Sequence, residues 1–125
     1  MAEALAERAR ERERLIELAR SYVERLSRRR PLLAAAVVGS VARGDFNVWS
    51  DVDVVIVAAD LPERAPDRGR LLVEDAPGGV QPVGFTPEEL TEALRRGNAL
   101  AREAVTSPVV LLGGELLGRI AAESP

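Results

Sequence analysis

Three chemically distinctive residue types are missing from this chain of 125 residues, which contains no cysteine, no histidine and no lysine. The absence of cysteine excludes disulfides, thiolate nucleophiles and cysteine-based zinc sites. The absence of histidine removes the most common general base and the most common metal ligand. All 17 basic residues are arginine, so Schiff-base and P-loop lysine chemistry are excluded as well. Any bound metal must be held by oxygen ligands, which favours Mg²⁺ or Mn²⁺.

Long apolar runs and aromatic residues are also scarce. No apolar run approaches the ~20 residues that span a bilayer, so we expect no contact with a membrane. The first residues alternate between Glu and Arg, unlike a signal or transit peptide, which favours a cytoplasmic protein. The net charge is −3 and aromatic residues make up 3% of the chain, so broad binding to nucleic acid is not expected.

The chain has the length of one domain. Residues 2–29 carry apolar side chains at helical spacing and predict one long helix that ends before Pro31. Before Glu13 the apolar stripe thins, so we expect the first third of this helix to project, fray or contact a partner. Within a single domain, we therefore distinguish an N-terminal helix, residues 1–30, from a compact part, residues 31–125.

The rest of the chain alternates between short apolar runs and helical patterns. Strands are predicted where apolar or β-branched residues run together, at residues 32–38, 51–59, 80–85 and 108–112. Helices are predicted after the capping box that begins at Thr86, from residue 99 and from residue 115. Residues 60–69 are expected to form a loop, and residues 70–75 a short strand or the tail of a helix. The pattern predicts an α/β (α+β) fold, with a small mixed sheet and helices packed mainly on one side.

The first predicted strand runs directly into Gly39-Ser40, and Gly44 closes the short helix-compatible stretch that follows. Glycine lets the backbone approach a phosphate closely, the next amides can point at it, and the Ser40 hydroxyl adds a donor. Arg43 can supply positive charge to a triphosphate. Taken alone, such a motif more often marks an ordinary connection from a strand to a turn.

Asp51 and Asp53 are two positions apart at the start of the second strand, so both side chains point to one face, about 6.6 Å apart at Cα. Two carboxylates so placed repel each other unless a cation lies between them. The alternative is that both face solvent where a strand follows a turn. Because Asp51 follows Gly39 by twelve positions, a short loop can bring the carboxylates and the phosphate cradle together, as phosphoryl or nucleotidyl transfer requires.

These two segments, Gly39-Ser40-x-Ala42-Arg43-Gly44 and Ser50-Asp51-x-Asp53, resemble the signature of the DNA polymerase beta nucleotidyltransferase superfamily, and in particular its minimal nucleotidyltransferases. The resemblance implies the nucleotidyltransferase fold, Mg²⁺ or Mn²⁺ at Asp51 and Asp53, and ATP or another nucleoside triphosphate at Gly39, Ser40 and Arg43. It also implies a helical partner of the HEPN type, a role as the antitoxin of a toxin–antitoxin pair, and transfer of AMP from ATP to that partner.

The sequence departs from the superfamily pattern at one position. Members carry a third carboxylate on a neighbouring strand, which activates the acceptor hydroxyl. Here the matching strand is residues 80–85, placed near a sheet edge by Pro82, and its polar position is Gln81. Glutamine cannot act as a base and is a poor ligand for the catalytic metal. Glu74 and Asp75 could substitute only if the strand begins earlier than predicted.

Two hypotheses follow for the function. In the first, the chain is an enzyme that transfers a nucleotide, with AMP from ATP preferred, to a protein hydroxyl. In the second, it is a binding module with the same fold that recognises a partner and turns over poorly or not at all. Self-association into a homodimer is compatible with both. Trp49 is expected to pack the loop before Ser50 rather than to stack on a base.

Overall fold

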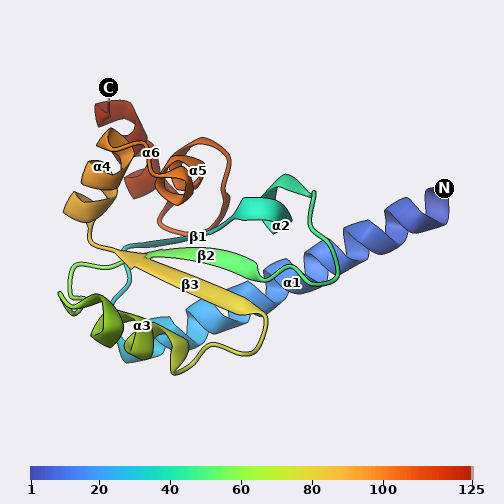
Figure 1. Cartoon of the computed structure of the whole chain (residues 1–125), viewed down its shortest axis with the longest axis horizontal. Coiled ribbons are helices and arrows are strands. Elements are labelled where there is room, and N and C mark those ends of the chain that lie inside the picture. Colours follow the sequence, from blue (N-terminus) through green and yellow to red (C-terminus); the bar gives the residue numbers. More distant parts are fainter. Residues whose placement is uncertain (125) are drawn as a thin grey trace.

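Figure 1 shows the computed structural model of the chain, which describes residues 1–124. Its centre is a four-stranded sheet with helices around it. The strand order is β3-β2-β1-β4. β1 is antiparallel to both of its neighbours, whereas β2 and β3 are parallel, so the sheet is mixed. The strands are β1 Ala34–Val38, β2 Val52–Val57, β3 Val80–Phe85 and β4 Val109–Leu112. The predicted fold class is confirmed, and β3 lies at an edge, as Pro82 indicated.

Helices cover both faces of this sheet, which corrects the prediction that they lie mainly on one side (Figure 1). Buried residues of α1 and α3 form one cluster with the sheet, and buried residues of α4, α5 and α6 form a second cluster. The helices are α1 Ala2–Arg29, α2 Gly39–Arg43, α3 Ala65–Val73, α4 Pro87–Arg95, α5 Ala99–Thr106 and α6 Gly114–Glu123.

The composition of β1 explains why two layers are needed. All five residues of β1 are buried, and successive side chains alternate between the two clusters. Ala35 and Val37 face α1, whereas Ala34, Ala36 and Val38 face the α4–α6 layer. A strand that is apolar on both faces must be covered on both faces.

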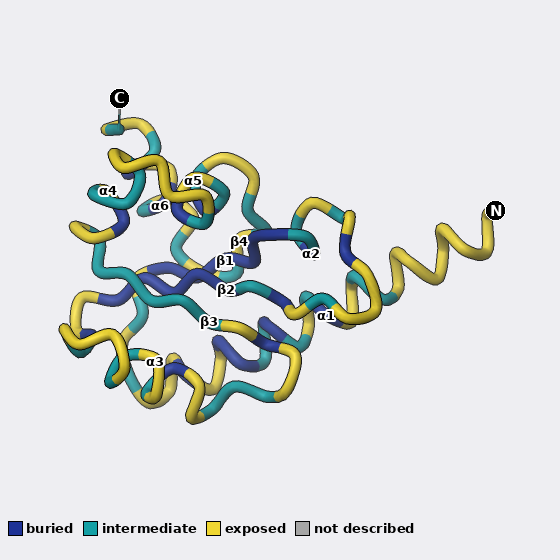
Figure 2. The backbone as a smooth tube through the Cα atoms, viewed as in Figure 1, coloured by how far each residue is buried: buried dark blue, intermediate teal, exposed yellow. Residues whose placement is uncertain are grey.

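The long helix α1 matches its predicted bounds. Its C-terminal half, from Leu15 to Leu26, contributes buried side chains to the first cluster. Residues 1–10 are all exposed, and Figure 2 shows this segment extending beyond the body of the molecule. The helix ends at Arg29, and Arg30 is extended immediately before Pro31. The expected projection of the first third of α1 is therefore confirmed.

The predicted loop at residues 60–69 is wrong in its second half, because α3 begins at Ala65. Pro66 occupies the first turn of α3, where a missing amide hydrogen costs nothing. The fully buried side chain of Leu72 supplies the apolar contact that a single short helix needs. Residues 70–75 are accordingly the tail of a helix, one of the two predicted alternatives.

The helix α4 begins as predicted. The Thr86 hydroxyl accepts a hydrogen bond from Glu89 N (3.1 Å), and Thr86 N donates to Glu89 Oε1 (2.8 Å), which completes the capping box. Asn98 then caps α5 by accepting from Ala101 N (3.0 Å). This cap fixes the start of α5, and with it the position of Glu103 one turn later.

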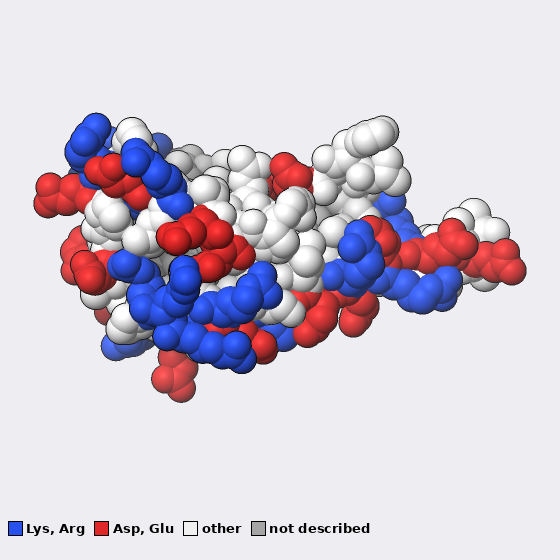
Figure 3. Space-filling view, turned by 90° about the horizontal axis from the view of Figure 1, so that it is seen from below, with Lys and Arg blue, Asp and Glu red and all other residues white. Residues whose placement is uncertain are grey.

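The surface charges are mixed in sign. Figure 3 shows a contiguous group of Arg side chains on one part of the face in view, with acidic side chains around it, and side chains of both signs along the projecting segment. Between residues 1 and 124, none of the helices is both long and apolar enough to cross a membrane.

Candidate functional site

Gly39 connects β1 to α2 and lies against Asp53, one of the two carboxylates predicted to bind a metal. Its φ is +75°, a conformation that side-chain-bearing residues rarely adopt. A Cβ on residue 39 would lie 2.5 Å from Asp53 Oδ2, so the Asp53 carboxylate would have to move to accommodate it. The positive φ favours glycine, and the backbone of the predicted phosphate cradle lies against the carboxylate of a predicted metal ligand.

Asp53 lies on β2 beside the end of β1, because its register partner there is Val38. Its side chain is half-buried, whereas Asp51, just before β2, is exposed. Burial raises the pKa of Asp53, the negative charges of Asp51 and Glu103 raise it further, and Arg43 partly opposes them. Asp53 thus carries a charge that its surroundings disfavour, and a cation beside it would relieve this.

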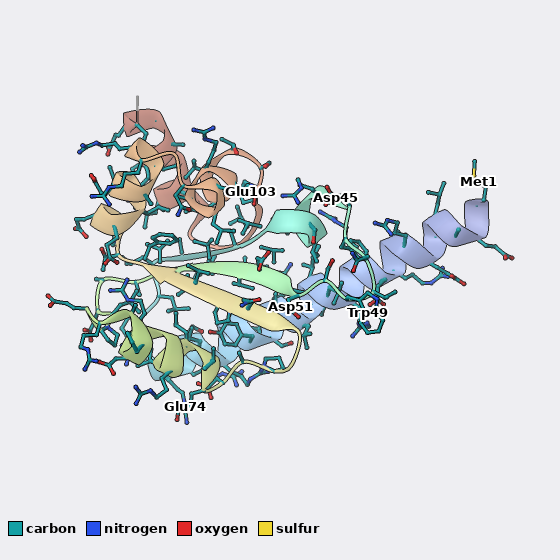
Figure 4. All side chains as sticks on the ribbon, viewed as in Figure 1. Met1, Asp45, Trp49, Asp51, Glu74 and Glu103 are labelled. Atoms are coloured by element: carbon teal, nitrogen blue, oxygen red, sulfur yellow. The ribbon has the colours of Figure 1, made fainter. Side chains whose placement is uncertain are left out.

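Gln81 lies beside Asp53, because the two residues are register partners on the parallel strands β3 and β2. Partners in register project to the same face of a sheet, so Gln81 faces the side of the two carboxylates, and it is exposed. The alternative carboxylates are elsewhere: Glu74 and Asp75 both pair with Arg29 of α1. Figure 4 shows Glu74 beyond α3, on the far side of the sheet from Glu103.

Arg43 is already paired on two sides. Its Nε donates to Asp45 Oδ2 (3.2 Å), and its Nη1 pairs with Glu103 Oε1. Gly39 N donates to the other oxygen of the same carboxylate, Glu103 Oε2 (2.9 Å). Figure 4 shows Glu103 projecting from α5 toward α2. Two of the donors predicted for a phosphate are thus engaged by one carboxylate of the protein itself.

Glu103 was not among the residues that the sequence predicted for the site. Sixty-four positions separate it from Gly39, and no motif spacing links α5 to α2. The available signal was weak: Glu103 borders the buried face of a short helix that Ala101 and Ala104 define. Only the three-dimensional packing of α5 against β1 brings the carboxylate to the site.

The loop between α2 and β2 differs from its prediction at Trp49. The Trp49 side chain is 89% exposed, so it does not pack the loop, which is held instead through Asn47 and Ser50. The buried aromatic residue of the loop is Phe46. The guanidinium carbon of Arg8 lies 4.5 Å from the centre of its ring. Trp49 borders an open groove of about 770 Å³ between this loop and the first turns of α1.

Two arginines of α1 donate hydrogen bonds to backbone carbonyl groups of α2 and of the loop that follows it. Arg12 donates from Nε to Val41 O (2.9 Å) and from Nη2 to Ala42 O (2.9 Å). Arg8 donates to Gly44 O from Nη2 (3.1 Å) and also contacts Phe46 O. Backbone carbonyls at the end of α2 and in the loop after it are thereby satisfied by α1.

The carboxylates present suit a magnesium ion that brings further ligands with it. Among residues 1–124, no group of three or more Asp or Glu side chains is arranged to hold a metal. Asp51 and Asp53 together supply two oxygen-bearing groups on one face. Mg²⁺ is commonly bound in this way, through one or two carboxylates together with substrate phosphates and water.

Comparisons with known proteins agree with this arrangement. The family described as "Nucleotidyltransferase domain" matches residues 19–101, more than half of the chain and all of the predicted site residues. No curated protein matches the chain significantly. A crystal structure from Sulfolobus solfataricus, described as a "putative nucleotidyltransferase", is similar with a TM-score of 0.62 and 24% identity. The similarity covers 82% of this chain and 84% of that one, and at this identity it supports the fold alone.

Proposed function

Because the chain belongs to the nucleotidyltransferase domain family, we propose that it binds a nucleoside triphosphate with Mg²⁺ or Mn²⁺ and transfers the nucleotide to a protein hydroxyl. ATP is the proposed donor and AMP the transferred group. The observation that carries the proposal is the direct contact between the Gly39 backbone and Asp53, which joins the phosphate cradle to the carboxylate pair.

Each site residue has a proposed role. Gly39, Ser40 and Arg43 bind the phosphates, because backbone amides, a hydroxyl and a guanidinium are all donors to anionic oxygen. Asp51 and Asp53 hold the metal. The metal, when bound, neutralises phosphate charge and polarises the reacting phosphoryl group.

The proposed reaction is balanced without any cofactor beyond the metal. The acceptor oxygen forms a bond to the α-phosphorus, the bond from that phosphorus to the bridging oxygen of the β-phosphate breaks, and pyrophosphate leaves. The acceptor proton goes to solvent water in this proposal, because Gln81 beside Asp53 cannot accept it and Asp51 and Asp53 are assigned to the metal. Orientation by the site then provides the main contribution to the rate.

The proposed acceptor is a hydroxyl of a helical partner of the HEPN type, with this chain acting as the antitoxin in the cytoplasm. Two exposed features support a protein partner: the first ten residues of α1, and Trp49 beside the groove. A nucleic-acid acceptor is disfavoured by the net charge of −3 and by the acidic side chains around the Arg group in Figure 3.

A second candidate function is a binding module that retains the fold but turns over poorly or not at all. Gln81 at the register position beside Asp53 favours it, because this position lacks a proton acceptor. In this case the bound nucleotide, or the fold itself, serves recognition of the partner.

Labelling with α-³²P-ATP distinguishes the two functions. The chain is incubated with Mg²⁺ and a co-expressed helical partner, beside an Asp51→Asn control that removes a proposed metal ligand. Label on the partner that disappears in the control supports transfer. Label that is seen only after Gln81→Glu supports the binding module. Absence of label in every variant, together with absence of Mg–ATP binding by calorimetry, would contradict nucleotidyl transfer and any role of a bound nucleotide in recognition.

A further inference from the structure

Glu103 engages two donors that the proposed function assigns to phosphate. One oxygen of its carboxylate accepts from Gly39 N (2.9 Å), and the other pairs with the Arg43 guanidinium. The Glu103 side chain is only 24% exposed, whereas Arg43 is 47% exposed, so the carboxylate sits on the inner side of the pair. A mostly enclosed anion with a separate partner for each oxygen is held more firmly than an ordinary surface ion pair.

A carboxylate and a phosphate bind to these donors in the same way. Both are anionic, and both accept hydrogen bonds from backbone amides and from guanidinium groups. A nucleotide phosphate that reaches Gly39 N and Arg43 therefore has to displace the carboxylate of Glu103. We infer that Glu103 is a built-in competitor for the nucleotide: it occupies the cradle of the empty protein and must swing away before phosphate binds. This inference rests on the proposed function of the same site.

The charges around the site strengthen the competition. The carboxylates of Asp51, Asp53 and Glu103 lie near one guanidinium, that of Arg43, which Asp45 also contacts. A triphosphate that enters without a metal adds negative charge to a site that is already negative. A divalent cation at Asp51 and Asp53 offsets part of that charge. Glu103 therefore makes the site selective for nucleotide accompanied by its metal.

The opening movement is small. Glu103 is on α5, an eight-residue helix whose buried residues are Ala101 and Ala104, so its carboxylate can leave the cradle by side-chain rotation while the helix stays packed. The match to the nucleotidyltransferase family ends at residue 101, so Glu103 lies outside the matched segment. The competitor belongs to a different element from the cradle that it closes.

Calorimetric titration of Mg–ATP into the wild-type chain and into Glu103→Gln tests this inference. The variant keeps the size of the side chain but removes its charge, so it should bind Mg–ATP about tenfold more tightly, as expected if the open cradle is populated at about 10% in the wild type. The gain should be larger for ATP with EDTA, where no cation offsets the charge of Glu103. Glu123→Gln, which removes one charge from the exposed end of α6, should leave the affinity unchanged.

Glu103→Asp provides a second variant, because its shorter side chain keeps the charge but cannot reach both donors. It should also bind Mg–ATP more tightly, by a smaller factor. Unchanged or weaker binding in both folded variants would overturn the inference, and weaker binding would make Glu103 a ligand instead. If wild type and variants are folded by circular dichroism but none binds Mg–ATP, the proposed function fails together with the inference.

Discussion

Individual carboxylates in this chain occupy opposite electrostatic environments. Asp53 is half-buried among other acidic groups, and its pKa is raised, chiefly by burial and then by Asp51 and Glu103. Glu89 accepts hydrogen bonds from Arg68 Nη1 (2.7 Å) and from Thr86 N (2.8 Å). The Arg68 hydrogen bond, together with that from Thr86, lowers the pKa of Glu89. The same side-chain chemistry therefore destabilises the fold at one position and stabilises it at the other.

Asp53→Asn should stabilise the folded chain at neutral pH. A carboxyl whose pKa is raised on folding favours the folded state at low pH, and this advantage is lost as pH rises through the raised pKa. We expect the free energy of unfolding to increase by about 0.5–1 kcal/mol at pH 7, a modest value because solvent screens a half-exposed group. Urea denaturation at pH 7 and at pH 3.5 measures the effect, and the difference should vanish at the lower pH. An equal gain in Asp60→Asn, on an almost fully exposed side chain, would contradict this explanation.

Glu89→Gln should show the opposite dependence. A carboxylate whose pKa is lowered on folding stabilises the protein above its unfolded pKa, and the contribution is lost as pH falls through the lowered value. The variant should lose up to about 1 kcal/mol at pH 7, because Glu89 is substantially exposed. Thermal unfolding from pH 7 down to pH 3 should show the two proteins converging. Glu88→Gln, in the same turn but without the Arg68 contact, serves as the control; a loss of equal size there would assign the effect to the helix terminus alone.

The sequence allowed the residues of the phosphate and metal motifs to be proposed because they are close together in the chain. Asp51, Asp53 and Gly39 belong to adjacent elements, and Gln81 is the polar position of the strand that the family resemblance assigns to the third carboxylate. Glu103 could not be predicted, because its contact depends on how α5 packs over β1. The exposure of Trp49 could not be predicted either, because the sequence does not show that Phe46, rather than Trp49, is the buried aromatic residue of the loop.

At the scale of elements, α1 supports the site through arginine side chains as well as through its apolar residues. Arg8 and Arg12 are four positions apart, so both project from one face of the helix toward α2 and its loop. They satisfy carbonyl groups that a five-residue helix leaves without partners. The geometry of the cradle thus depends on a helix that supplies none of the predicted site residues.

Arg12→Ala should destabilise the fold by about 1–3 kcal/mol, because two charge-assisted hydrogen bonds are lost and the carbonyls of Val41 and Ala42 lose their donor. It should also weaken binding of Mg–ATP by loosening α2. Guanidinium denaturation and calorimetry measure the two effects. Arg10→Ala removes the same side chain from an exposed position on α1 and should change neither quantity. Equal effects of both substitutions would show that the α1–α2 hydrogen bonds contribute nothing specific.

Secondary structure was predictable wherever local chemistry decides it. The capping box at Thr86 and Glu89 and the proline after α1 fixed helix ends directly. The first half of α3 was missed because Pro62, Pro66 and the charged residues around them resemble a loop, and the stability of this helix comes from tertiary contacts. One of these is the hydrogen bond from Tyr22 Oη on α1 to Leu72 O (2.7 Å). The apolar sequence of β1 does indicate that both faces of the sheet are covered, but which helices lie on which face depends on tertiary packing.

The whole molecule consists of a compact body and one projecting segment. Buried side chains of α1 begin at Leu15, and residues 1–10 are exposed (Figure 2). Stability should therefore depend on α1 from Arg8 onward and hardly at all on the turn before it.

Deletion of residues 2–6 should change the free energy of unfolding by no more than about 0.5 kcal/mol, as for surface changes in general. Leu26→Ala, at a position only 2% exposed, should cost about 2–5 kcal/mol because it leaves a cavity. Urea denaturation compares the two variants. A deletion as costly as Leu26→Ala would show that the projecting turns are part of the cooperative fold. If the deletion instead removes labelling of the partner while stability is kept, the segment serves recognition.

The site straddles two separately packed layers. Val41 anchors α2 to the α1 cluster, whereas Ala101 and Ala104 anchor α5 to the cluster shared with α4 and α6. A ligand that displaces Glu103 removes a tie between these layers while it fills the cradle. By thermodynamic linkage, whatever loosens α5 favours the ligand, and the ligand loosens α5 in return. Amide hydrogen exchange in α5 should therefore become faster when nucleotide binds. Binding of nucleotide at α2 would then be detectable as increased mobility of α5, in the other layer.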